Sequence, residues 1–247
     1  MLRVLAISLL LLTPTQARSA PGQLIVVVDA GHGGTARGAV GVHGVLEKRV
    51  ALKAAQKLRL ALGQLVGVKV VMTRSTDRYL TLSERVRRAN RAGGHLFVSL
   101  HCNASKDHSQ RGFEAFVLTP QGLERQARPL ARGPITAQTA LAGVQPRRLA
   151  LSATLADLAR RGLRRRAVIF GRAVITGLKH TLGATRSRGL RQAHFDVLKG
   201  LKMPGLLVEM GFIDHPVEGK LVATDRYLSR VVHSVTRAVR RYGKRYG

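Results

Sequence analysis

Residues 23–34, QLIVVVDAGHGG, join a continuous run of apolar, mostly β-branched residues to a glycine-rich loop. A run of this kind is typical of a central strand that is buried on both faces of a parallel sheet. Two further apolar runs, LFVSLH at residues 96–101 and GLLVE at residues 205–209, also end on a polar side chain. We therefore expect a parallel sheet that carries its chemistry at the carboxyl ends of its strands.

The rest of the chain alternates short apolar runs with segments of helical spacing. The expected strands are 23–29, 68–73, 96–100, 112–118 and 205–209, and the expected helices are 47–62, 82–92, 149–161, 167–182 and 227–242. Strands that alternate with helices favour parallel pairing through crossover helices. The pattern predicts a single α/β domain over residues 22–243, with a twisted, mostly parallel central sheet flanked by helices on both faces. We expect a loop or helical insertion at about residues 121–165.

The composition fits one folded domain and excludes several classes of protein. With 247 residues and 45% apolar residues, the chain has enough material for a packed core. The single cysteine, Cys102, excludes an intramolecular disulfide and a four-cysteine metal cluster. Lysine and arginine number 42 against 13 aspartate and glutamate, a net charge of +29. We therefore expect non-specific electrostatic binding to anionic polymers.

The N-terminal segment has the pattern of a secretory signal. Arg3 precedes an apolar run at residues 4–12, and small residues follow at Ala17 and Ala20. The run is too short to span a bilayer. We expect a signal peptide over residues 1–17, with cleavage after Ala20 as an alternative, and hence an exported protein. An ordinary buried strand or helix is the other interpretation.

Four side chains form a candidate site at the carboxyl edge of the expected sheet. These are His32, His101 and Glu209, which follow apolar runs, and Glu47, which opens the first expected helix. Two imidazoles, one carboxylate and an open position make a zinc site of the catalytic kind, and a further glutamate can move protons. Each residue also has a simpler interpretation, as a turn residue, a carboxylate facing the helix dipole or a hydrogen-bonded core histidine. Their joint placement favours the metal site.

Two other motifs are weaker. Gly31, Gly33 and Ala36 match a dinucleotide-binding pattern, but a glycine-rich segment follows where an amphipathic helix is required. Cys102 is adjacent to His101 on an extended segment, where neighbouring side chains point to opposite faces. A catalytic Cys-His pair is therefore not expected, and Cys102 is interpreted as a small buried residue.

Taken in order, the blocks VVVDAGHGG, SLHCNAS and VEMGFI resemble the zinc-dependent N-acetylmuramoyl-L-alanine amidases of the Amidase_3 type, over about residues 24–242. In that family the histidine of the first block, the following glutamate and the histidine of the SLH block bind zinc, and the glutamate of the last block is catalytic. The resemblance implies one zinc ion per chain held by His32, Glu47 and His101. It assigns the transfer of protons to Glu209.

The resemblance also implies a substrate, a location and a form of regulation. The substrate is the amide bond between N-acetylmuramic acid and L-alanine in peptidoglycan, and the location is the periplasm or the cell wall. Cell-division members of the family carry a helical insertion whose acidic residue blocks the zinc until a protein activator binds. Glu124 and Asp157 are the candidates for such an inhibitory or supporting residue here. Asp157 lies in LADLARRGL, which is more typical of a core helix than of a plug.

Two alternative functions stay open. An exported basic protein that binds nucleic acid or another polyanion agrees with the net charge. However, the chain has no tryptophan, only 4 tyrosines and 6 phenylalanines, and its arginines are spread over the whole sequence. We therefore expect no specific nucleic-acid partner. An inactive amidase-like protein that binds peptidoglycan is the second alternative.

Overall fold

A computed structural model describes residues 23–120 and 146–246 of the chain. The predicted signal peptide, its alternative cleavage after Ala20 and the candidate inhibitory residue Glu124 lie outside the described residues. In the described part, no helix combines the length and the apolar character that crossing a membrane requires.

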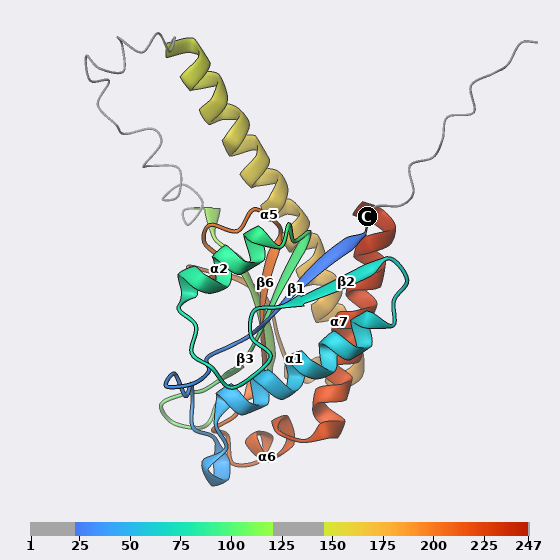
Figure 1. The fold of residues 1–247 in the computed structure, drawn as a ribbon. Helices are drawn as coiled ribbons and strands as arrows, with labels where there is room; N and C mark the ends of the chain where they lie inside the picture. The colour runs from blue at the N-terminus through green and yellow to red at the C-terminus, as the bar shows by residue number, and fades with distance from the viewer. Residues whose placement is uncertain (1–22, 121–145, 247) are drawn as a thin grey trace, which may run out of the picture.

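The centre of the described structure is one six-stranded sheet (Figure 1). The strands are β1 (Leu24–Ala30), β2 (Val68–Met72), β3 (Leu96–Asn103), β4 (Phe113–Leu118), β5 (Ser187–Ala193) and β6 (Gly205–Phe212). Their order across the sheet is β2-β1-β3-β6-β4-β5. The first four strands in this order are parallel to one another, β4 is antiparallel to β6, and β5 is parallel to β4. The expectation of a mostly parallel sheet is confirmed.

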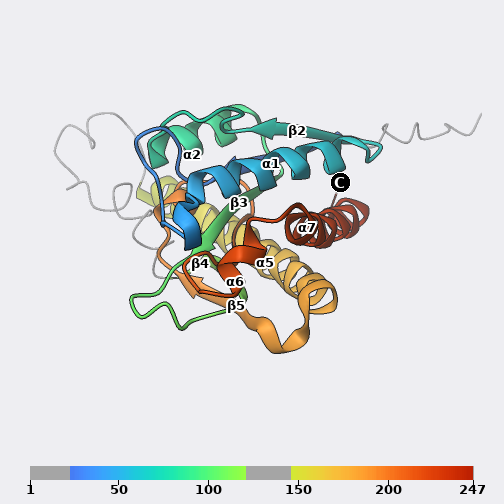
Figure 2. The same cartoon turned by 90° about the horizontal axis from the view of Figure 1, so that it is seen from below.

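Helices cover both faces of this sheet, as expected (Figures 1 and 2). They are α1 (Glu47–Gly63), α2 (Leu82–Arg91), α5 (Pro146–Leu182), α6 (Glu218–Val222) and α7 (Asp225–Tyr246). The larger apolar core joins one face of the sheet to α1, α5 and α7. A smaller core joins the other face to α2 and to the short 3-10 helix Asp196–Leu198.

The alternation of side chains along the central strands decides which face carries the site. Val27 of β1, Phe97 of β3 and Leu207 of β6 all belong to the smaller core on the α2 face. His101 lies four residues beyond Phe97 and Glu209 lies two residues beyond Leu207. Since residues an even number apart share one face of a strand, both site residues lie on the α2 face.

Three elements differ from the expectation. Residues 146–182 form the single helix α5 and not two helices, because the arginine-rich residues 162–166 contain no proline and continue the helix. The edge strand β5 was not predicted, since its sequence SRGLRQA offers Leu190 as its one large apolar residue. Backbone pairing with β4 holds it in place. Helix α6 has five residues, too few for a periodic pattern.

The interpretation of the Asp157 segment as part of a core helix is wrong. The residues are helical, but Leu155 and Leu158 on either side of Asp157 are 57% and 59% exposed. Asp157 pairs within the helix, with Arg161 at 2.7 Å. Figure 1 shows the N-terminal half of α5 projecting away from the sheet, where little of the core is available to bury it.

Candidate metal and catalytic site

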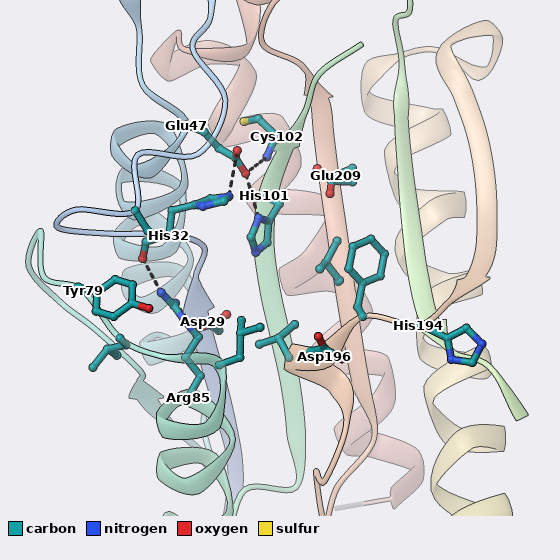
Figure 3. Close-up of a pocket in the computed structure, with 16 residues that line it drawn as sticks. Asp29, His32, Glu47, Tyr79, Arg85, His101, Cys102, His194, Asp196 and Glu209 are labelled. Carbon is teal, nitrogen blue, oxygen red and sulfur yellow. Dashed lines mark hydrogen bonds and ion pairs between the residues drawn. The ribbon is translucent and has the colours of Figure 1, made fainter. Parts of the chain in front are cut away.

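Three of the four predicted site residues meet at the carboxyl edge of the sheet (Figure 3). His32 lies in the loop after β1, Glu47 begins α1 and His101 lies on β3. The carboxylate of Glu47 lies between the two imidazoles, with its Oε2 3.0 Å from His32 Nε2 and its Oε1 2.9 Å from His101 Nδ1. One ligand atom from each residue lies within 4.8 Å of the other two. Tetrahedral zinc with bonds of about 2.0 to 2.1 Å holds its donor atoms roughly 3.3 Å apart, so this donor set fits such an ion.

Backbone contacts fix the Glu47 carboxylate in this position. Its oxygens accept hydrogen bonds from the Ala39 amide at 2.9 Å and the Cys102 amide at 3.1 Å. Burial alone would raise the pKa of Glu47, but the hydrogen bonds from His101 and His32 outweigh it and hold the pKa far below the usual range. The carboxylate is therefore ionised and oriented, as a metal ligand needs to be.

The glycines of the first loop are required by close packing around the ligands. A Cβ atom at Gly31 would lie 2.3 Å from His101 Cε1. A Cβ atom at Gly38 would lie 2.6 Å from Glu47 Oε2, and the φ angle of Gly38 is +70°. Gly31 and Gly38 therefore let the backbone approach the ligand side chains, and this contact explains Gly31 of the dinucleotide-binding pattern.

Glu209 lies beside these residues in a different environment. It is paired in register with His101 on the neighbouring strand and is 8% exposed. Its Oε2 atom is buried and has no hydrogen-bond partner among the described residues. Burial raises the pKa of Glu209 to about 7, and the nearby carboxylates of Glu47 and Glu114 act in the same direction. The pocket thus holds a carboxyl group that can both accept and return a proton near neutral pH.

One pocket of about 510 Å³ contains all four predicted residues. Its walls include further side chains that the sequence did not single out, namely Asp29, Tyr79, Leu80, Arg85, Asp196 and Val197. His194, for which the sequence favours only a surface or packing role, lines the pocket as well (Figure 3). Asp157 is not among the residues that line it.

Cys102 is also part of the pocket wall, but its environment does not favour reaction. Burial raises the pKa of its thiol well above the usual range, and the charge of Glu47 adds to the effect. The thiol therefore stays protonated, and a protonated thiol is a poor nucleophile. This agrees with the interpretation of Cys102 as a small buried residue.

Comparison with known proteins identifies the family. The family model Amidase_3, described as N-acetylmuramoyl-L-alanine amidase, matches residues 26–241. The chain belongs to the Amidase_3 family. This confirms the family to which the DAGHGG, SLHCNA and VEMGFI blocks point, and all three blocks lie within the matched range.

Relatives named as N-acetylmuramoyl-L-alanine amidases match most of this chain. It is 30% identical to the N-acetylmuramoyl-L-alanine amidase AmiA of Escherichia coli K12 over 240 residues, which cover 92% of the chain and 78% of AmiA. It is 29% identical to AmiC of Escherichia coli O6:H1 over 245 residues, which cover 93% of the chain but 56% of AmiC. The chain thus spans little more than half the length of that relative. The N-acetylmuramoyl-L-alanine amidase of Clostridium difficile 630 has the same fold, with a TM-score of 0.69 at 22% identity, over 92% of this chain and all of the other.

Proposed function

We propose that this Amidase_3 protein is a zinc-dependent hydrolase that cleaves the amide bond between N-acetylmuramic acid and L-alanine in peptidoglycan. One observation carries the proposal. A buried carboxyl oxygen of Glu209 without a described partner shares one pocket with the converging ligand atoms of His32, Glu47 and His101. Family membership supplies the substrate class.

His32, Glu47 and His101 are the residues that would hold one zinc ion. Two neutral imidazoles and one carboxylate are a ligand set of catalytic zinc sites, in which a fourth position stays open for water or substrate. When bound, zinc supplies Lewis acidity that makes water a better nucleophile and polarises the carbonyl of the amide. The ionised state of Glu47 suits this role.

Glu209 is assigned the movement of the proton. Its Oε2 atom, which has no hydrogen-bond partner among the described residues, takes one proton from the water that attacks the lactyl carbonyl carbon bonded to the nitrogen of L-alanine. The same oxygen then returns the proton to the departing amine nitrogen, because an unprotonated amide nitrogen leaves poorly. The products are the free lactyl carboxylate and a stem peptide with a free amino terminus at L-alanine.

The proposed location is outside the inner membrane, in the periplasm or at the cell wall. The apolar N-terminal run and the peptidoglycan substrate support it. Peptidoglycan is the proposed partner, and a protein activator is proposed as a second one by resemblance to the cell-division members. Glu124 and Asp157 stay candidate inhibitory residues, although Asp157 lies outside the pocket in this structure.

Two substitutions test the proposal together. Glu209→Gln keeps the shape of the side chain but removes its basicity, so zinc should stay bound while the rate falls about 10²- to 10⁴-fold. Glu47→Ala should instead lose most bound zinc, because two histidines alone are a poor zinc site. Zinc is measured by elemental analysis, and activity by mass spectrometry of the stem peptides released from purified peptidoglycan.

Asp225→Asn is the matched control, since it makes the same type of change at an exposed carboxylate on α7 that pairs with Lys53 and Lys57. It should keep both zinc and activity. Near wild-type cleavage by Glu209→Gln contradicts the assigned mechanism. If Glu209→Gln loses zinc, Glu209 is itself a zinc ligand, and one of His32, Glu47 and His101 is not. A wild-type protein that binds peptidoglycan and zinc but releases no peptide is an inactive binder.

A further inference from the structure

The loop that carries His32 has an irregular backbone conformation, neither helical nor extended. His32, Gly33 and Gly34 have φ angles of 57°, 124° and 56°, all in or near the left-handed region. A residue with a side chain is less stable in this region than in the right-handed one, because its Cβ atom lies too close to the following carbonyl oxygen. Other contacts must therefore hold His32 in this conformation.

Two buried guanidinium groups make those contacts. Arg85 of α2 donates to the carbonyl of Ala30 at 2.6 Å through Nη1 and to the carbonyl of His32 through Nη2 (Figure 3). Arg74, which follows β2, donates to the carbonyl of Ala30 at 2.9 Å through Nε and to that of Gly31 at 2.6 Å through Nη2. Three successive carbonyl groups of the loop are thus bound by arginine.

Arg74 also connects this loop to the helix that carries Glu47. Its Nη2 atom donates to the carbonyl of Lys48, the residue after Glu47, at 3.0 Å. Arg74 is completely buried, and the hydrogen bonds described for it all go to backbone carbonyls. One guanidinium group therefore fixes the spacing between the segments of two predicted metal ligands, His32 and Glu47.

Arg85 is in turn held by Asp29, which is completely buried on β1. Asp29 Oδ1 accepts from Arg85 Nη1 at 2.8 Å and from the Thr73 hydroxyl, and Oδ2 accepts from the Ser99 hydroxyl at 2.7 Å. A buried ion pair of this kind often adds little stability compared with well-packed apolar residues. The more specific consequence of this ion pair is that it fixes the position of the Arg85 guanidinium group.

We propose that Arg74 and Arg85 are positioning residues that hold the His32 loop and the first turn of α1 in the arrangement that binds zinc. The inference rests on the proposed function, because it takes His32 and Glu47 as ligands. Neither arginine is assigned a contact with the reacting atoms. Their effect passes through the backbone of residues 30–32 and 48.

Arg85→Lys and Arg74→Lys test this directly. Lysine keeps the positive charge but lacks the planar fork, so one ammonium group cannot replace the set of bonds to several carbonyls. Loss of residues that orient metal ligands typically weakens metal binding about 10- to 100-fold. We expect the Kd for zinc, measured by competition with a chelator, to rise by this factor in both variants. The visible spectrum of the Co²⁺-loaded variants should also change, because it reports the geometry of the ligands.

Arg88→Lys is the matched control, since Arg88 lies on α2 one turn after Arg85 and donates to the Thr73 carbonyl at 2.9 Å, outside the loop. It should bind zinc as the wild type does. If Arg85→Lys fails to fold, the pair Asp29→Asn and Arg85→Met removes both buried charges together, and the same loss of affinity is expected. Wild-type affinity and an unchanged Co²⁺ spectrum in a folded Arg85 variant overturn the inference and leave the proposed function intact. A wild-type protein that binds no zinc overturns the proposed function as well.

Discussion

At the scale of single residues, Glu47 and Glu209 lie in one pocket but have opposite shifts in pKa. Hydrogen bonds from two histidines outweigh burial at Glu47 and lower its pKa, whereas burial raises the pKa of Glu209 to about 7. The Oε2 atom of Glu209 has no hydrogen-bond partner among the described residues. The first environment favours a permanent anion and the second a group that exchanges protons. The hydrogen-bond donors around each carboxylate therefore distinguish Glu47, a permanent anion, from Glu209, which exchanges protons.

The raised pKa of Glu209 predicts how the stability of the metal-free protein depends on pH. Between its usual pKa of 4.5 and about 7, the folded protein retains a proton at Glu209 that the unfolded chain has released. The free energy of unfolding should therefore fall as the pH rises through this window. Urea denaturation in the presence of a chelator, at pH 5 and at pH 7.5, measures this decrease.

Glu209→Gln should make that decrease smaller, because glutamine does not titrate. His101 also has a raised pKa, because burial is outweighed by the hydrogen bond to Glu47 and the charge of Glu209, and it acts in the same direction above pH 6.5. Glu209→Gln removes the Glu209 charge and therefore reduces this contribution as well. The lowered pKa values of Glu47 and Asp29 change the free energy of unfolding only at pH values below this window. Identical pH dependence in the two proteins would contradict the environment described for Glu209.

At the scale of elements, α2 presents Arg85 to the loop, and its first turn is fixed by a capping box. The Thr81 hydroxyl accepts from the Glu84 amide at 3.2 Å, and the Glu84 carboxylate accepts from the Thr81 amide at 2.8 Å. Thr81→Ala should lower the free energy of unfolding by about 1 kcal/mol, because the helix start loses its hydrogen-bond acceptor. Urea denaturation measures the change. Ser83→Ala, at an exposed position in the same turn, is the control and should change stability less; equal effects of both substitutions would show that the cap contributes nothing specific.

At the scale of the whole molecule, the chain has a net charge of +29, and its described part exposes arginines on both helical layers. Arg230 and Arg237 are exposed on α7, and Arg87 and Arg91 are exposed on α2, on the opposite face of the sheet (Figure 2). We expect adsorption to polyanions to arise from total charge and to fall steeply between about 50 and 200 mM salt. Replacing both arginines of one pair with glutamate should then weaken binding to DNA or another polyanion as much as replacing the other pair does. Salt-dependent retention measures this binding.

A much larger loss for one of these pairs would instead indicate a localised binding surface. A preference for one DNA sequence that survives 200 mM salt would favour the nucleic-acid alternative over the proposed enzyme. Either outcome is read from the same retention experiment, with peptidoglycan cleavage measured in parallel to show that the variants are folded.

The sequence by itself determined the central strands and the place of the site. The runs at residues 23–29, 96–100 and 205–209 are so apolar that burial is their only favourable environment, and parallel strands bring their carboxyl ends to one edge. The sequence alone therefore predicts that His32, His101 and Glu209 lie together. The edge strand β5 could not, because backbone pairing with β4 and not its side chains makes it a strand.

Only the tertiary structure decided which charged residues serve the site. In the sequence, Arg85 and Arg87 are equivalent members of an arginine-rich helix, yet one is 2% exposed and the other lies in solvent. The partners that make burial of a cation favourable are distant along the chain. Arg85 meets Asp29 across 56 positions, and Arg74 meets Gly31 across 43. A buried charge is stable where its partners converge, and that convergence exists only once the sheet, α2 and the His32 loop have packed together.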